Sequence, residues 1–160
     1  MPNKFVVITS DSTNEMKTAT VSELLRHARA LLEMDIVFVS EFLDGRRFFR
    51  HVDAGEDSLS LIEEGQSNPL EETYCQRIVD GRLPLAIPDT HLLPEANNLN
   101  VTKALNIRAY LATPITSPDG QVMGTICCIS HKSRTALGSR EIDSLRSIAR
   151  RIAVDLQKDS

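Results

Sequence analysis

The sequence is poor in aromatic side chains and in long apolar runs. Aromatic residues make up 4% of its 160 residues and tryptophan is absent, so leucine, isoleucine, valine and alanine must fill the core. No segment approaches the ~20 apolar residues that a membrane-spanning helix needs. The apolar run Phe5–Ile8 near the start is too short for a secretory signal. We therefore expect a cytoplasmic protein with no membrane partner.

An excess of positive charge is also lacking. The formal net charge is -4, which argues against a nucleic-acid partner, because neutralising phosphates requires a basic surface. Arginines cluster within 46–50 and again within 146–151. Both clusters alternate with acidic or apolar residues, and we interpret them as solvated faces.

Cysteine and histidine are too few and too scattered for a disulfide framework or a metal site. Cys75, Cys127 and Cys128 are an odd number, and two of them are adjacent. The 4 histidines show no paired spacing of the kind that binds zinc. We expect no metal and favour core packing for the three thiols, since free cysteine is commonly buried.

The two ends of the chain have the strongest helical pattern. Thr20 and Glu23 form a capping box, in which each side chain accepts a hydrogen bond from the other residue's backbone, so a helix is predicted over 20–34. Ser139 is predicted to cap a final helix that runs to about residue 157. Apolar residues recur along both helices at spacings of three and four, which indicates one buried face on each.

Turn residues define two hairpins between these helices. Asp44-Gly45 tolerate positive φ and predict a tight turn, and the sequence SPDG at 117–120 predicts a second one. The strands are expected at 35–43, 47–52, 84–88, 108–116 and 121–130, short helices at 70–79 and 102–105, and loops at 53–69 and 91–100.

Hairpins dominate the order of elements, so the sheet should be antiparallel and the fold class α+β. Residues 1–19 form a lead-in or edge segment, in which Phe5–Ile8 is either an extra edge strand or a docking tail. Residues 20–157 then form a single domain.

Several short motifs occur in a characteristic order. Residues 74–90 read YCQRIVDGRLPLAIPDT, and residues 107–149 contain YLATPI, the turn PDG and the strand GTICC before the final helix. Together these motifs resemble the GAF family of sensor domains, and more narrowly the GAF domains of bacterial histidine kinases and cyclic-dinucleotide enzymes. The similarity extends from about residue 20 to residue 156.

The resemblance implies a GAF-like (profilin-like) six-stranded antiparallel sheet. The N- and C-terminal helices would cover one face, and loops and short helices would enclose a ligand pocket on the other. It implies a small-molecule-sensing role in signal transduction rather than catalysis. Such domains commonly accompany a kinase, cyclase or phosphodiesterase domain, in the same chain or in a partner.

Strand alternation assigns candidate pocket residues. Arg108 and Tyr110 share one face of their strand, as do Thr125 and Cys127 on the next, and we assign this polar face to the pocket. The alternative is that Arg108 is exposed and Tyr110 packs in the core. The candidate ligand-binding residues are Tyr74, Cys75, Ile78, Asp89, Thr90, Arg108, Tyr110, Thr125 and Cys127.

Three other functions are known for the GAF fold. Some GAF domains hold a bilin through a cysteine thioether, but this sequence has no Cys-His pair for it, and a bilin is not expected. A GAF-fold reductase of free methionine sulfoxide is the enzymatic alternative; its reactive thiol would need a nearby positive charge, for which Arg77 and Arg108 are candidates. A ligand-free dimerisation module is the third. The ligand stays open between a cyclic nucleotide, an amino acid, haem and none.

The terminal helices carry more apolar residues than packing against the chain's own sheet requires, so we expect a homodimer that forms through a helical bundle. Burying a large aliphatic side chain contributes ~1.5–3 kcal/mol, which favours pairing of any exposed remainder. The candidate interface residues are Val21, Leu24, Ala28, Leu31, Ile142, Leu145, Ala149, Ile152 and Leu156.

Overall fold

The computed structural model describes residues 4–7 and 17–158, with side-chain positions for residues 20–155. The fold is α+β, with one six-stranded antiparallel sheet in the order β5-β4-β3-β8-β7-β6 and a separate two-stranded sheet, β1-β2. The predicted sheet is confirmed. The main strands are β3 (Ile36–Leu43), β4 (Arg46–Ala54), β5 (Ser67–Pro69), β6 (Ala86–Ile87), β7 (Ala109–Thr116) and β8 (Val122–Ser130).

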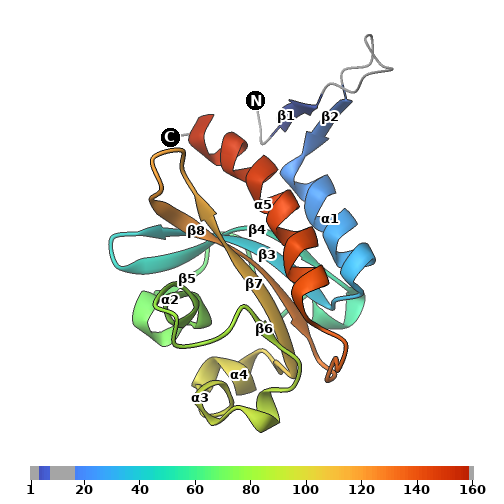
Figure 1. The fold of residues 1–160 in the computed structure, drawn as a ribbon, viewed down its shortest axis with the longest axis vertical. Coiled ribbons are helices and arrows are strands. Elements are labelled where there is room, and N and C mark those ends of the chain that lie inside the picture. Colours follow the sequence, from blue (N-terminus) through green and yellow to red (C-terminus); the bar gives the residue numbers. More distant parts are fainter. Residues whose placement is uncertain (1–3, 8–16, 159–160) are drawn as a thin grey trace.

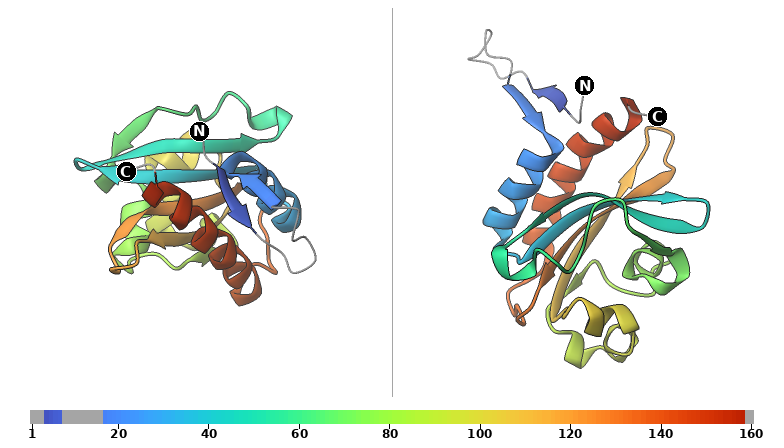
Figure 2. Two further views of the ribbon diagram at one scale, coloured as in Figure 1. Left: turned by 90° about the horizontal axis from the view of Figure 1, so that it is seen from above. Right: turned by 180° about the vertical axis from the view of Figure 1, so that it is seen from behind.

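The helices divide between the two faces of this sheet (Figures 1 and 2). The two long helices lie side by side on one face, and the short helices lie on the other, with one exception. The long helices are α1 (Val21–Leu32) and α5 (Ser139–Lys158); the short ones are η1 (Glu56–Ser58), η2 (Leu70–Glu72), α2 (Tyr74–Val79), η3 (Thr90–Leu92), α3 (Pro94–Asn97) and α4 (Asn100–Ala104). The exception is η1, which lies at the end of the sheet next to the C-terminal end of α1.

Local capping fixes where the long helices begin. Thr20 caps α1 through the predicted box, because its hydroxyl accepts from the Glu23 N–H and the Glu23 carboxylate accepts from the Thr20 N–H. The prediction that Ser139 caps α5 is wrong by one residue. The Gly138 carbonyl already accepts the Ile142 N–H at 3.0 Å, and the Gly138 N–H donates to Glu141 at 2.9 Å.

Each face of the sheet has its own apolar core. Successive strand residues point to opposite faces, so Leu111 and Cys128 pack toward α1 and α5 while Tyr110 and Cys127 pack toward α2. The core under the long helices is aliphatic, whereas the other core contains the buried rings of Phe38, Tyr74 and Tyr110 as well. Further fully buried members of the aliphatic core are Val21, Leu25, Ala28, Val37, Val39, Ala109, Ile126, Leu145 and Ile152.

The segment between the hairpins has more structure than predicted. The helix expected over 70–79 is interrupted at Thr73, whose extended backbone (φ -107°) separates η2 from α2 and whose hydroxyl caps α2 by accepting from the Gln76 N–H. The expected loop 53–69 contains η1 and β5, and the expected loop 91–100 contains η3 and α3. These elements are too short to show a periodic pattern of apolar residues from which they could be predicted.

The lead-in pairs with itself rather than with the main sheet. β1 (Lys4–Val7) and β2 (Lys17–Thr20) form an antiparallel ribbon, and the Ile8 end of the predicted apolar strand lies outside the described residues. β2 ends at Thr20 and α1 begins at the next residue. Across the part of the chain that the structure describes, no helix combines the length and apolar character needed to cross a membrane.

Candidate functional site

A cavity of about 670 Å³ opens on the sheet face opposite α1 and α5. It lies between the β4–β5 edge of the sheet and the short helices, so its walls come from segments far apart in the sequence. The wall is mixed, with apolar side chains, amides, two arginines and two glutamates. It is lined by Arg47, Phe49, Leu61, Ile62, Gln66, Ser67, Asn68, Glu71, Glu72, Thr73, Arg77, Asn98, Leu99, Asn100, Val101, Ala104 and Leu105.

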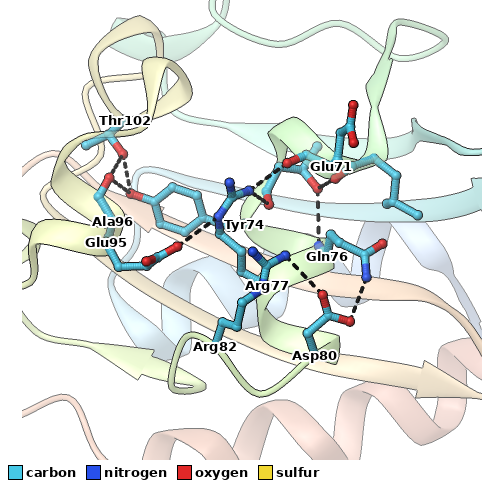
Figure 3. Close-up of polar contacts among 11 residues, drawn as sticks. Glu71, Tyr74, Gln76, Arg77, Asp80, Arg82, Glu95, Ala96 and Thr102 are labelled. Carbon is cyan, nitrogen blue, oxygen red and sulfur yellow. Dashed lines mark hydrogen bonds and ion pairs between the residues drawn. The ribbon is translucent and has the colours of Figure 1, made fainter.

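Tyr74 ties α2 to the helices on the far side of the cavity (Figure 3). Its buried hydroxyl is hydrogen-bonded to the Thr102 hydroxyl and donates to the Ala96 carbonyl at 3.4 Å. Burial raises the pKa of Tyr74 to about 12, against a smaller opposing effect of the bond with Thr102. The tyrosine is therefore neutral near pH 7 and serves as a fixed strut between α2 and α4.

Arg77 ties α2 to its neighbours on the rim of the cavity (Figure 3). Its Nη1 donates to the Glu71 carbonyl at 2.8 Å and to the Thr73 carbonyl at 3.0 Å, and its Nε pairs with Glu95 at 3.2 Å. These contacts hold η2, α2 and α3 together around one guanidinium, so the wall is built by charge-assisted hydrogen bonds as well as by packing.

Arg47 is the charged group at the base of the cavity, with only 2% of its surface exposed. Its Nη2 donates to the Asn68 side-chain carbonyl at 2.7 Å, its Nη1 donates to the Cys75 sulfur at 3.5 Å, and its guanidinium carbon lies 4.2 Å from the Phe49 ring centroid and 5.5 Å from that of Phe38. Its Nε is buried without a hydrogen-bond partner among the described residues.

The prediction that the arginines at 46–50 form a solvated face is wrong for Arg47. Side chains alternate along β4, so Arg47 points inward with Phe49 while Arg46 and Arg50 point outward. The spacing of Arg47 and Phe49, two residues apart on a strand, was the available signal. Stacking on aromatic rings makes burial of a guanidinium tolerable, although it does not neutralise the charge.

A cluster of thiols and hydroxyls lies beneath Arg47, between α2 and the sheet. The Cys75 sulfur is 3.9 Å from the Cys127 sulfur and 3.1 Å from the Thr125 hydroxyl oxygen. The Cys127 thiol donates to that same oxygen at 3.1 Å, and the Ser40 hydroxyl lies 2.8 Å from it. All four side chains are buried.

The two sulfurs of this cluster differ in acidity. Burial raises the pKa of the Cys75 thiol, but the neighbouring Cys127 side chain and the charge of Arg47 outweigh it and hold the pKa well below its ordinary value. Burial and the neighbouring Cys75 both raise the pKa of Cys127. Cys128 points to the other core, where burial alone raises its pKa. The cation near the thiols is thus Arg47, rather than the predicted Arg77 or Arg108.

None of the nine predicted ligand-binding residues lies on the wall of the cavity. α2 covers this part of the sheet, so strand residues that face this side form a core layer, and the cavity opens one layer further out. As ligand contacts the nine stay a prediction, but their positions are those of core and edge residues. Tyr74, Cys75, Ile78, Tyr110, Thr125 and Cys127 belong to the buried layer beneath the cavity.

The other three predicted residues hold the loop after β6 against the start of β7. Asp89 pairs with Arg108 through two bonds, at 2.7 Å and 3.2 Å, and accepts the His91 N–H at 3.0 Å. The buried Thr90 donates from its hydroxyl to the Ile107 carbonyl at 2.9 Å. Their contacts within the chain account for all three side chains structurally.

Most of the predicted dimer residues are buried in the chain's own core. Leu31, by contrast, is 54% exposed on α1, and Ile142 is half-buried. The side chain of Leu156 lies outside the described residues. Val154 on α5, which was not predicted, is 51% exposed. The residues already used by the core are Val21, Leu24, Ala28, Leu145, Ala149 and Ile152.

The antiparallel sheet, with long helices on one face and a cavity under short helices on the other, defines a sensor-type α+β domain. The sequence matches the GAF domain family over residues 18–156. The chain belongs to the GAF domain family, and the resemblance stated from the sequence motifs is confirmed.

One curated relative is the cyclic di-GMP phosphodiesterase of Pseudomonas aeruginosa, which is 24% identical over 129 residues. The match covers 80% of this chain but 21% of the relative, so this chain spans about a fifth of that protein. The phosphodiesterase activity is that of the larger relative.

Similar solved structures are photoreceptor GAF domains. They include the PixJ GAF domain of Thermosynechococcus elongatus in its blue-light-absorbing form (22% identity, 86% of this chain and 83% of that one, TM-score 0.67) and a far-red cyanobacteriochrome (17%, 86% and 84%, 0.68). A third is a phycoerythrobilin-bound GAF domain of a cyanobacterial phytochrome (16%, 85% and 82%, 0.67). At these identities the likeness shows the fold alone.

The residues of this cavity do not fit a covalently attached bilin. Its lining contains no cysteine, and the sulfurs of Cys75 and Cys127 lie beneath the wall with no exposed surface. Many of the wall residues were missed from the sequence because they come from the β4–β5 edge and from the segment around α4, neither of which carries a motif; Arg77 lies in the 74–90 motif but was not predicted to face a ligand.

Proposed function

We propose that this GAF domain is a small-molecule-sensing regulatory domain that binds its ligand in the cavity between β4–β5 and the short helices. The cavity carries the proposal. Its volume of about 670 Å³ lies within the ~300–1,000 Å³ range typical of small-ligand sites, and its wall combines apolar surface with a few directed polar groups. The amides of Asn68, Asn98 and Asn100 offer both donors and acceptors to a ligand.

The sheet couples this cavity to the long helices. Tyr110 and Cys127 lie in the layer below the cavity, and their neighbours Leu111 and Cys128 pack against α1 and α5. A shift of β7 or β8 on ligand binding would therefore move both layers together. We propose that the ligand acts by changing the relative populations of helix arrangements.

The output is proposed to pass through a homodimer and a catalytic partner domain. Leu31 and Val154 supply exposed apolar surface on α1 and α5. The phosphodiesterase relative is much longer than this chain, which fits a GAF domain that regulates a kinase, cyclase or phosphodiesterase domain in the same chain or in a partner. A monomeric mass by light scattering at micromolar concentration would contradict the dimer.

The residues that line the cavity also bear on the two alternative functions, reduction of free methionine sulfoxide and ligand-free dimerisation. No described thiol lines the cavity, which favours binding over thiol-dependent reduction of free methionine sulfoxide. Its open volume favours ligand binding over a purely dimerising module. Replacing Cys75, Cys127 and Cys128 together tests the reductase alternative, because only a thiol-dependent enzyme would lose activity.

Filling the cavity tests the proposal directly. Ala104 lines the cavity and is exposed, so Ala104→Phe fills the space without disturbing the core. Ala30→Phe is the matched control, since Ala30 is exposed on α1, on the opposite face. Native mass spectrometry for a co-purified ligand, and thermal shifts with cyclic GMP, cyclic di-GMP and amino acids, would identify the binding compound.

We expect Ala104→Phe to weaken binding of that compound at least tenfold and Ala30→Phe to leave it unchanged. Unchanged affinity in Ala104→Phe would place the ligand elsewhere. Failure of every compound to bind, with no co-purified molecule, would favour the ligand-free dimerisation module.

A further inference from the structure

Among the residues that the structure describes, no carboxylate forms an ion pair with the buried guanidinium of Arg47. The ion pairs formed within the described residues involve other arginines, and Arg47 contacts only the Asn68 amide, the rings of Phe38 and Phe49, and the sulfur of Cys75. A buried charge without a counter-charge is strongly disfavoured. Of these contacts, only Cys75 can carry a full negative charge.

The surroundings of Cys75 fit a thiolate. Arg47 Nη1 donates to the sulfur at 3.5 Å, and the Thr125 and Ser40 hydroxyls, which are able to donate, lie 3.1 Å and 3.8 Å from it. Cys127 lies 3.9 Å away as the second thiol. A disulfide needs sulfurs about 2.05 Å apart, so an approach of roughly 2 Å would join them.

We infer that Cys75 is the thiolate counter-ion of Arg47 and that Cys75 and Cys127 form an oxidisable pair, which hydrogen peroxide converts to a disulfide. This modification site is separate from the proposed ligand function, because it requires no ligand in the cavity. Nucleophilic attack requires the thiolate form of cysteine, and a neighbouring cation supports that form at neutral pH.

The reaction balances in two steps. The Cys75 thiolate attacks one peroxide oxygen, an S–O bond forms as the O–O bond breaks, and hydroxide leaves, giving a sulfenic acid. The Cys127 sulfur then attacks the Cys75 sulfur; the S–S bond forms, the S–O bond breaks, and the departing hydroxide takes the Cys127 proton as water. The sulfurs lose two electrons, and peroxide is reduced to water and hydroxide.

Burial selects the oxidant. Cys75 and Cys127 have no exposed surface and neither lines the cavity, so only a small uncharged oxidant can reach their sulfurs. Hydrogen peroxide is of this kind, whereas an amino-acid sulfoxide is too large. Cys128 provides an internal control, because it is equally buried but packs in the aliphatic core, away from Arg47.

The test exposes the full chain to hydrogen peroxide, blocks remaining thiols with N-ethylmaleimide in denaturant, and maps the peptides by mass spectrometry. We expect a Cys75–Cys127 disulfide, with Cys128 alkylated as a free thiol. Cys127→Ala should instead leave Cys75 as a sulfenic acid, which dimedone traps when it is added together with denaturant. Cys75 should react at least tenfold faster than Cys128.

Arg47→Lys and Arg47→Met separate charge from packing. The lysine variant should retain most of the oxidation rate, and the methionine variant should lose at least tenfold. Circular dichroism confirms that each variant is folded before its rate is read. Wild-type protein that stays fully reduced under peroxide, or that oxidises Cys75 and Cys128 equally, would overturn the inference without affecting the ligand proposal.

Discussion

Substituting Gly124 should destabilise the sheet at its centre. Gly124 lies on β8 opposite Glu41 of β3, and a Cβ built on it would lie 1.9 Å from the Ser40 carbonyl oxygen, 2.8 Å from the Ser40 carbonyl carbon and 3.0 Å from the Glu41 Cα. All three are backbone atoms of a central strand. No side-chain rotation can relieve the contact, so β3 and β8 would have to separate.

The expected cost of Gly124→Ala follows from that separation. Overpacking a rigid site costs about 1–3 kcal/mol, and loss of one or two ladder hydrogen bonds adds about 1 kcal/mol each. We expect a decrease of about 3 kcal/mol in the free energy of unfolding. For a chain of this size the melting temperature would fall by roughly 6–12 °C.

Urea unfolding followed by circular dichroism measures this difference, with Gly138→Ala as the control. A Cβ at Gly138 would meet no atom within 4 Å, and we expect a change of less than about 1 kcal/mol there. A loss below about 1 kcal/mol in Gly124→Ala would refute the close approach of β8 to Ser40.

Two further predictions concern buried hydroxyls and one surface ion pair. Tyr74→Phe should lower the free energy of unfolding by about 1 kcal/mol, because it removes the hydrogen bonds to Thr102 and Ala96. Tyr110→Phe should be neutral or stabilising, since that buried hydroxyl has no hydrogen-bond partner among the described residues. Urea unfolding of the two variants and the wild type measures both differences. The hydrogen bonds from Arg108 hold the pKa of Asp89 below its ordinary value. The ion pair therefore stabilises the folded state fully above about pH 4, and this contribution is lost as the pH falls further. Between pH 6, 4 and 3, the free energy of unfolding should fall more steeply in the wild type than in Asp89→Asn. Parallel decreases in the two proteins would contradict the ion pair between Asp89 and Arg108.

Features that depend on neighbouring residues could be predicted from the sequence. The capping box of Thr20 and Glu23 and the turn at Asp44-Gly45, where φ is 53° and 76°, need only local chemistry. Alternation along the strand similarly separates Cys127 from Cys128, which lie in the two different cores. The order of these local elements was sufficient to identify the family.

The cavity could not be predicted in the same way, because distant segments define it. Arg47 is buried only because Asn68, Cys75 and two phenyl rings surround it, and no spacing in the sequence brings these together. Strand alternation assigned Tyr110 correctly to the face opposite the long helices. It could not show that α2 seals that layer and moves the open space outward.

Thr20 has a mechanical consequence, because it is both the last residue of β2 and the cap of α1. No flexible hinge separates the ribbon from the helix, so the two should turn as one lever, with the capping box as its rigid joint. A movement that tilts the ribbon would therefore tilt all 12 residues of α1, because no flexible linker lies between them to absorb it. In this arrangement the stiffness of the first turn of α1 should determine how much of a movement of the ribbon reaches the rest of the helix.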